Sequence, residues 1–217
     1  MLVGFVLLSV MDAASPALVA TAAGLGAFHG LNPAMGWLFA VALGLYAQSR
    51  RVALVSLVPI ALGHAVSVAL VLAGALTLGA FAGHDMLARA CGALLIGWGA
   101  WRAWRGHRGR PTVGMRTGLA GLALWSFVMS SAHGAGLMLV PALLPLCTGK
   151  VAAGAFEASA IALTVHTAAM LAVIAAISMF AMSVQARGGL GILRSGWINV
   201  DWIWSAALIG CGVFLFV

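Results

Sequence analysis

Charged residues are scarce in this chain. Only 7% of its 217 residues are charged, and four of them are acidic, whereas soluble domains carry about 25% charged residues. Hydrophobic residues make up 64% of the chain, with a mean hydropathy of +1.13. A water-soluble fold cannot bury so large an apolar fraction, so the sequence predicts an integral membrane protein embedded in a lipid bilayer.

Cysteine is also scarce, and the basic residues have no aromatic residues interleaved among them. Cys91, Cys147 and Cys211 are scattered and form no CxxC pair, so neither a disulfide framework nor a zinc cage is expected. The net charge is +7, but the arginines lie in short segments without the interleaved aromatic residues that stack on bases. We therefore expect no nucleic-acid partner and assign these arginines to membrane orientation.

Six apolar stretches are long enough to cross a bilayer, for which about 20 residues suffice. They cover residues 17–48, 52–82, 86–104, 117–147, 151–184 and 197–217. Residues 1–16 form a short apolar N-terminal segment, which leaves a seventh span open, and residues 105–116 form a basic loop. If the spans alternate in direction, nine arginines share one side and only Arg89 and Lys150 face the other. The positive-inside rule then predicts a multi-pass protein of a bacterial inner membrane, with the loop in the cytoplasm and both termini outside.

The two halves of the chain resemble each other. Three pairs of segments correspond: His29–Gly30 with His133–Gly134, His64 with His166, and Ala93–Gly99 with Ala206–Gly212. Their offsets are 104, 102 and 113 residues. Because each half holds an odd number of spans, the halves enter the membrane in opposite orientations, as in secondary transporters. We expect an all-α fold in which residues 17–104 and 117–217 form two inverted three-helix repeats.

The candidate site consists of the four histidines in the middle of apolar stretches: His29, His64, His133 and His166. An ionisable side chain inside a bilayer is costly and marks a functional site by default. Two repeats related by a pseudo-twofold axis would bring the four imidazoles toward one midplane cavity, where neutral imidazoles would bind a transition-metal substrate. Whether all four meet there stays open. No tightly bound cofactor is expected, and the oligomeric state, homo-oligomer included, stays open. Further candidate ligands near these histidines are Asn32, Met35, Met138 and Met170.

Two readings of these neighbours stay open. Thioethers favour a soft ion such as copper(I), but methionine also fills gaps in apolar bundles.

A helix of residues 17–48 would be about 48 Å long at 1.5 Å per residue, well beyond the hydrocarbon core of about 30 Å. Gly30 and Pro33 predict a discontinuity within it, since Pro33 cannot donate a backbone hydrogen bond. A simple proline kink is the alternative.

Three short motifs carry a family resemblance: Gly26–Met35 (GAFHGLNPAM), Ala61–Ser67 (ALGHAVS) and Ser131–Gly136 (SAHGAG). They resemble the first-helix His-x4-Asp-His signature, the second-helix Leu-Gly-His segment and the second-half His-Gly segment of the nickel/cobalt transporter (NicO) superfamily and its UreH-like relatives, within the LysE-type transporters. The resemblance implies divalent-metal transport. Ala34 and Met35 stand where the signature has Asp-His, so the nickel or cobalt role of those two positions does not carry over.

Two other functions remain open from the sequence. The same fold could serve a LysE-like proton-coupled exporter of a small organic solute or anion, with the histidines carrying protons. A membrane accessory protein for metalloenzyme assembly could dock an acidic partner on residues 105–116. An enzyme is not expected, because the apolar stretches contain neither paired carboxylates nor a nucleophile next to a base.

Overall fold

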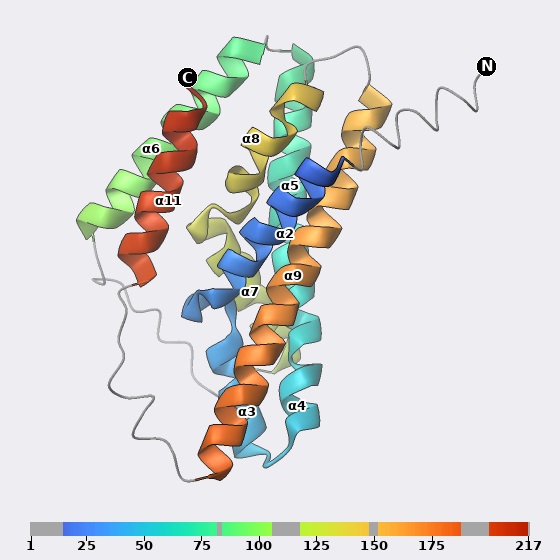
Figure 1. Ribbon diagram of the computed structural model, residues 1–217, viewed down its shortest axis with the longest axis vertical. Coiled ribbons are helices and arrows are strands. Elements are labelled where there is room, and N and C mark those ends of the chain that lie inside the picture. Colours follow the sequence, from blue (N-terminus) through green and yellow to red (C-terminus); the bar gives the residue numbers. More distant parts are fainter. Residues whose placement is uncertain (1–14, 82–83, 106–117, 148–151, 188–199, 217) are drawn as a thin grey trace, which may run out of the picture.

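The computed structural model describes residues 15–81, 84–105, 118–147, 152–187 and 200–216, and within these ranges the chain contains helices and no strand (Figure 1). The all-helical class expected from the sequence is therefore confirmed. The N-terminal segment 1–16 and the basic loop 105–116 lie almost wholly outside the described residues, as do most residues of the last interhelical connection.

The first half of the chain contains α2 (Pro16–Leu31), the 3-10 helix η1 (Pro33–Met35), α3 (Trp37–Tyr46), α4 (Arg50–Val55), α5 (Leu57–Phe81) and α6 (His84–Arg105). The second half contains α7 (Leu119–His133), α8 (Ala135–Cys147), α9 (Ala152–Ala186) and α11 (Val200–Phe214). The longest helix, α9, has 35 residues and is about 52 Å long at 1.5 Å per residue. Figure 1 shows α5 and α9 running through most of the length of the bundle.

Two segments of the described chain are long and apolar enough to cross a membrane, Arg50–Gly79 and Gly154–Ala186. A third span results if Leu119–His133 and Ala135–Leu144, which are bent by 55° at their junction, are counted as one. The remaining apolar helices, including α2 and α3, have 10–17 residues. By length and composition the described residues therefore contain two or three helical segments that could cross a membrane, and the six-span arrangement stays a prediction.

The first apolar stretch is broken after Leu31. Asn32 adopts an extended conformation (φ −70°, ψ 122°), as expected for a residue before proline. Its Oδ1 accepts the backbone N–H of Ala34 at 3.0 Å and so caps η1. Gly36 has a φ of +114°, a conformation that only glycine adopts at little cost. Because Asn32 and Gly36 adopt these conformations, α2 ends at Leu31 and α3 begins at Trp37, after only five intervening residues.

The second half has a break after its own His-Gly pair. Gly134 adopts a left-handed conformation (φ 69°, ψ 31°) and ends α7 directly after His133. Glycine is the usual residue at this position of a helix C-terminus. The last carbonyl groups of α7 are therefore available to side chains from other helices.

Helices of the first half pack on helices of the second half. α2 and α9 run in parallel, since a Cβ at Gly26 would overlap the His166 carbonyl and one at Gly30 would lie 2.6 Å from the Met170 carbonyl. α5 and α7 are also parallel, and a Cβ at Gly63 would overlap the carbonyl of Ala123. These close approaches require glycine.

The third pair, α6 and α11, is antiparallel and lies at one edge of the bundle (Figure 1). A Cβ at Gly92 would lie 2.9 Å from the carbonyl oxygen of Gly212, and a Cβ at Gly99 would lie 3.1 Å from that of Ser205. Each half of the chain thus contributes one helix to each of the three packed pairs.

Candidate metal site

Three histidines from three helices form one buried cluster. His29 lies in the last turn of α2, His64 in α5 and His166 in α9, and each is 1% exposed. Their ring centroids are 5.1 Å apart for His29–His64, 5.5 Å for His29–His166 and 5.3 Å for His64–His166. We call these three side chains the three-histidine cluster. The glycine contacts between α2 and α9 bring two of its members together.

The ring nitrogens of the cluster are mostly without hydrogen-bond partners among the described residues. His64 Nδ1 shares a hydrogen bond of 3.1 Å with the Ser130 hydroxyl from α7. Nε2 of His29, Nε2 of His64 and both nitrogens of His166 are buried and unpartnered. The Ala22 carbonyl lies near His166, but outside hydrogen-bonding geometry. Buried polar atoms are usually paired, so four unpaired nitrogens in one cluster require an explanation.

The spacing of the three rings matches that of a metal bound by three histidines. A metal–nitrogen distance of about 2.0–2.1 Å puts each ring centroid about 3.2 Å from the ion, and tetrahedral angles then separate the centroids by about 5.2 Å. The observed 5.1–5.5 Å brackets this value. As the side chains stand, however, no group of three His, Cys, Asp or Glu residues in the described part of the chain is positioned to hold a metal ion. The three side chains must therefore change orientation for their nitrogens to converge on one ion.

The fourth predicted ligand, His133, lies apart from the other three. The indole ring of Trp204, which is fully buried, lies between it and the cluster. The ring centroid of Trp204 is 4.7 Å from that of His29 and 5.9 Å from that of His133. Trp204 also stacks on Phe28 at 5.0 Å. The sequence left open whether all four histidines meet. The structure brings three of them together and places the ring of Trp204 next to both His29 and the fourth, His133.

Both ring nitrogens of His133 take part in other hydrogen bonds. Nδ1 donates to the Met129 carbonyl at 2.8 Å, and Nε2 accepts from the Arg102 guanidinium at 3.2 Å. Arg102 also donates to the Ala132 carbonyl at 3.1 Å. These partners fit a neutral imidazole with its proton on Nδ1. His133 therefore joins α7 to α6 and offers no free lone pair to a metal in this conformation.

Side chains from other helices cap the end of α7. The indole N–H of Trp98 donates to the Ala132 carbonyl, and that of Trp204 donates to the His133 carbonyl, each at 2.8 Å. Sequence reasoning missed Trp204 as a neighbour of the site, because nothing in its local sequence distinguishes it from a packing residue. Arg102 had a usable signal, since an arginine inside a predicted span needs a partner.

The methionines divide into two groups. Met35 and Met170 pack in one buried layer, the methionine layer, whose members are Met35, Ile60, Leu122, Met170 and Ile174. Met138 packs elsewhere, against Trp204, Leu95 and Leu208. Asn32 is buried, and its Nδ2 has no partner among the described residues. Its Oδ1 is used in capping η1, so Asn32 shapes the helix break next to the cluster.

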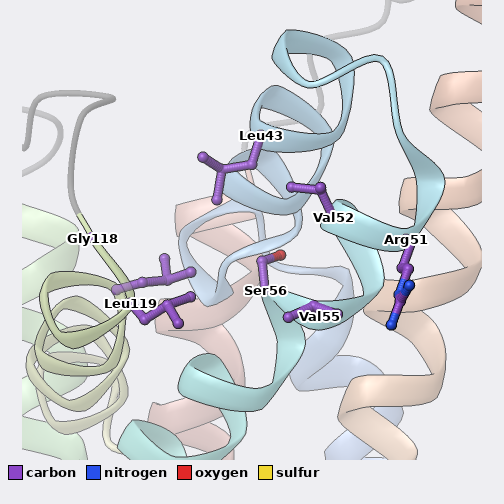
Figure 2. A pocket seen from close by; sticks show the side chains of 8 residues that line it. Leu43, Arg51, Val52, Val55, Ser56, Gly118 and Leu119 are labelled. Carbon is purple, nitrogen blue, oxygen red and sulfur yellow. The ribbon is translucent and has the colours of Figure 1, made fainter.

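An open groove lies between the ends of α3, α4 and α7 (Figure 2). Its lining residues are Leu43, Arg51, Val52, Val55, Ser56, Gly118, Leu119 and Leu122. Two of them, Leu43 and Leu122, also pack in or against the methionine layer. The groove and the methionine layer therefore share these two leucines.

Comparison with known proteins finds no matching family model, no curated relative and no similar solved structure. The resemblance to nickel/cobalt transporters thus remains an expectation from three short motifs.

Proposed function

We propose that this protein is an integral membrane transporter of a transition-metal cation, with the three-histidine cluster as its binding site. The observation that carries the proposal is the cluster itself, in which three buried imidazoles from three helices have the spacing of a metal site and four unpaired ring nitrogens. In this proposal the ion is the substrate, because a helix break of the kind found at transporter substrate sites follows His29. His133, the predicted fourth ligand, instead joins the end of α7 to α6 in this proposal.

The proposal includes six spans arranged as two inverted repeats in a bacterial inner membrane, with both termini outside. Contacts related by the repeat offsets support the two-repeat arrangement. The contact of Gly26 with His166 corresponds, after offsets of 104 and 102 residues, to a contact of Ser130 with His64. Those two residues share a hydrogen bond of 3.1 Å. Exchange of the two halves thus converts one observed contact into another.

The α6–α11 pair behaves in the same way. With the offset of 113 residues, Gly99 corresponds to Gly212 and Gly92 to Ser205. The contact between Gly92 and Gly212 then corresponds to one between Gly99 and Ser205, and both occur. Such reciprocal contacts are expected of two halves related by a pseudo-twofold axis, with a substrate site at their interface.

Helix breaks beside the cluster support transport over a purely structural role. α2 ends two residues after His29, and α7 ends at His133. Discontinuous helices near the membrane centre are a recurring feature of transporters, because they place helix ends and unwound backbone groups next to the substrate. A structural metal site would not need them.

Metal flux into proteoliposomes, reported by an entrapped metal-sensitive dye, tests the proposal. We expect wild-type protein and a His107→Ala control to transport the ion, and a His166→Ala variant of equal thermal stability to lose transport. Flux that follows a pH gradient and ignores metal would select the proton-coupled exporter instead. Retained metal flux in His166→Ala would contradict the proposal.

A further inference from the structure

We infer that the transported ion is a soft, singly charged cation of the copper(I) and silver(I) type, and that Met35 and Met170 bind it beside the three-histidine cluster. This inference rests on the proposed function and specifies its substrate. It assigns a role beyond packing to two buried thioethers.

The methionine layer is adjacent to the cluster on the helices that carry the histidines. Met170 follows His166 by four residues on α9, so the two side chains share a helix face. Helical side chains lean toward the N-terminus, which directs Met170 back toward His166. Ile60 precedes His64 by four residues on α5, and Met35 follows the break after His29. Met35 and Met170 are 3% and 0% exposed.

All three residues lie on the same side of the cluster. Figure 1 shows that α5 and α9 run in opposite directions, with the start of α5 and the end of α9 near α3 and α4. Ile60, before His64, and Met170, after His166, are therefore both displaced toward α3 and α4. The layer on the other side consists of aliphatic residues without sulfur, among them Leu18, Ala22, Val68 and Ala162. Met35 and Met170 thus belong to the layer on the α3 and α4 side of the cluster.

The charge of the site favours a singly charged ion. The described side chains include two carboxylates, Asp85 in the first turn of α6 and Glu157 on α9. Glu157 precedes His166 by nine residues, or about 13.5 Å along the helix. Neutral imidazoles and thioethers leave the full charge of the ion in an apolar interior. The cost of burying it scales with the square of the charge, so a divalent ion costs about four times as much as a monovalent one.

The ligand chemistry and the position of the open groove also favour a soft ion of the copper(I) type. Thioether sulfur binds copper(I) well, whereas nickel(II) and cobalt(II) prefer harder nitrogen and oxygen ligands. The methionine layer connects through Leu43 and Leu122 to the groove between α3, α4 and α7 (Figure 2). In this inference, an ion that leaves the histidines in that direction passes the thioethers before it reaches the groove beside Arg51.

The test is titration of the detergent-purified full chain with silver(I), zinc(II) and nickel(II) in parallel. Silver(I) is a suitable probe because it is monovalent, soft and stable in air. We expect wild type to bind silver(I) at least tenfold more tightly than either divalent ion. A Met35→Leu/Met170→Leu variant should lose at least tenfold in silver(I) affinity. Met138→Leu, a buried methionine in another cluster, is the matched control and should bind like wild type.

Four outcomes separate this inference from the proposed function. Tighter binding of zinc(II) or nickel(II), or unchanged silver(I) affinity in the double variant, would overturn the inference and leave metal transport standing. No binding of any metal by wild type would overturn both. If the double variant does not fold, X-ray absorption at the silver edge of the wild-type complex identifies the atoms that bind silver(I). Sulfur neighbours support the inference, and nitrogen neighbours alone refute it.

Discussion

Trp204 is the side chain whose replacement tests the packing of the site most sharply. Its indole N–H donates to the His133 carbonyl at the end of α7, at 2.8 Å. A Trp204→Phe substitution keeps an aromatic ring beside His29 but removes this donor. Trp98 and Trp125 serve as comparisons, because we expect their replacement by phenylalanine to cost less stability. Trp98 donates to the Ala132 carbonyl, which Arg102 also reaches.

Trp125 supplies the matched control. Its indole nitrogen is buried without a hydrogen-bond partner among the described residues, although its ring meets Phe39 edge to face at 5.4 Å. Trp125→Phe thus makes the same chemical change and removes no hydrogen bond. It even removes an unsatisfied donor, which is favourable.

The expected magnitudes follow from these contacts. Leaving a buried carbonyl without its donor costs about 1–3 kcal/mol, while interhelical hydrogen bonds in membrane proteins reach about 1.7 kcal/mol at most. We therefore expect Trp204→Phe to be destabilised by about 1–2 kcal/mol more than Trp125→Phe. Trp98→Phe should fall between them, because Arg102 still serves the same acceptor.

Reversible unfolding in mixed detergent micelles, followed by circular dichroism, measures the three free energies of unfolding. The order Trp204, Trp98, Trp125 is the predicted result. Equal losses in Trp204→Phe and Trp125→Phe would refute the assignment of the α7 end to indole capping.

Three further predictions concern packing and the surroundings of the cluster. Gly26→Val should prevent stable folding, because a Cβ there overlaps the His166 carbonyl, whereas Gly24→Val, with no atom within 4 Å of its Cβ, should fold normally by size-exclusion chromatography. Ser130→Ala should weaken metal binding by about 10–100-fold, the usual effect of removing a hydrogen bond to a ligating histidine, and unchanged affinity in titration would contradict this. Arg102→Gln should lower the thermal unfolding temperature more than Arg51→Gln, since Arg102 bonds to both Ala132 and His133; equal shifts would count against its capping role.

Much of the architecture follows from composition and local sequence. Apolar composition without strand-like alternation predicts helices, and the structure contains only helices in the described ranges. The steric rules for Asn32 and Pro33 account for the end of α2, and Gly134 for the end of α7. The number of spans does not follow as directly, because breaks and charged ends divide the apolar stretches into helices too short to qualify on length alone.

The site was partly predictable. The burial cost of a histidine in lipid singles out all four apolar-stretch histidines, but it cannot say which of them share a cavity. That depends on helix rotation and on Trp204, whose position between His29 and His133 comes from the packing of α11. The division of the methionines between two clusters likewise depends on tertiary packing, although Met170 could be assigned to the face of His166 from their spacing.

The most direct test of the account is the metal stoichiometry of purified wild-type protein beside four single variants. These are His29→Ala, His64→Ala, His133→Ala and His166→Ala, each titrated with silver(I) and nickel(II) after its fold has been checked. The account predicts one ion per wild-type chain, loss of binding when any member of the three-histidine cluster is removed, and full occupancy in His133→Ala. Loss of binding in His133→Ala, or full occupancy in any of the other three, would contradict it.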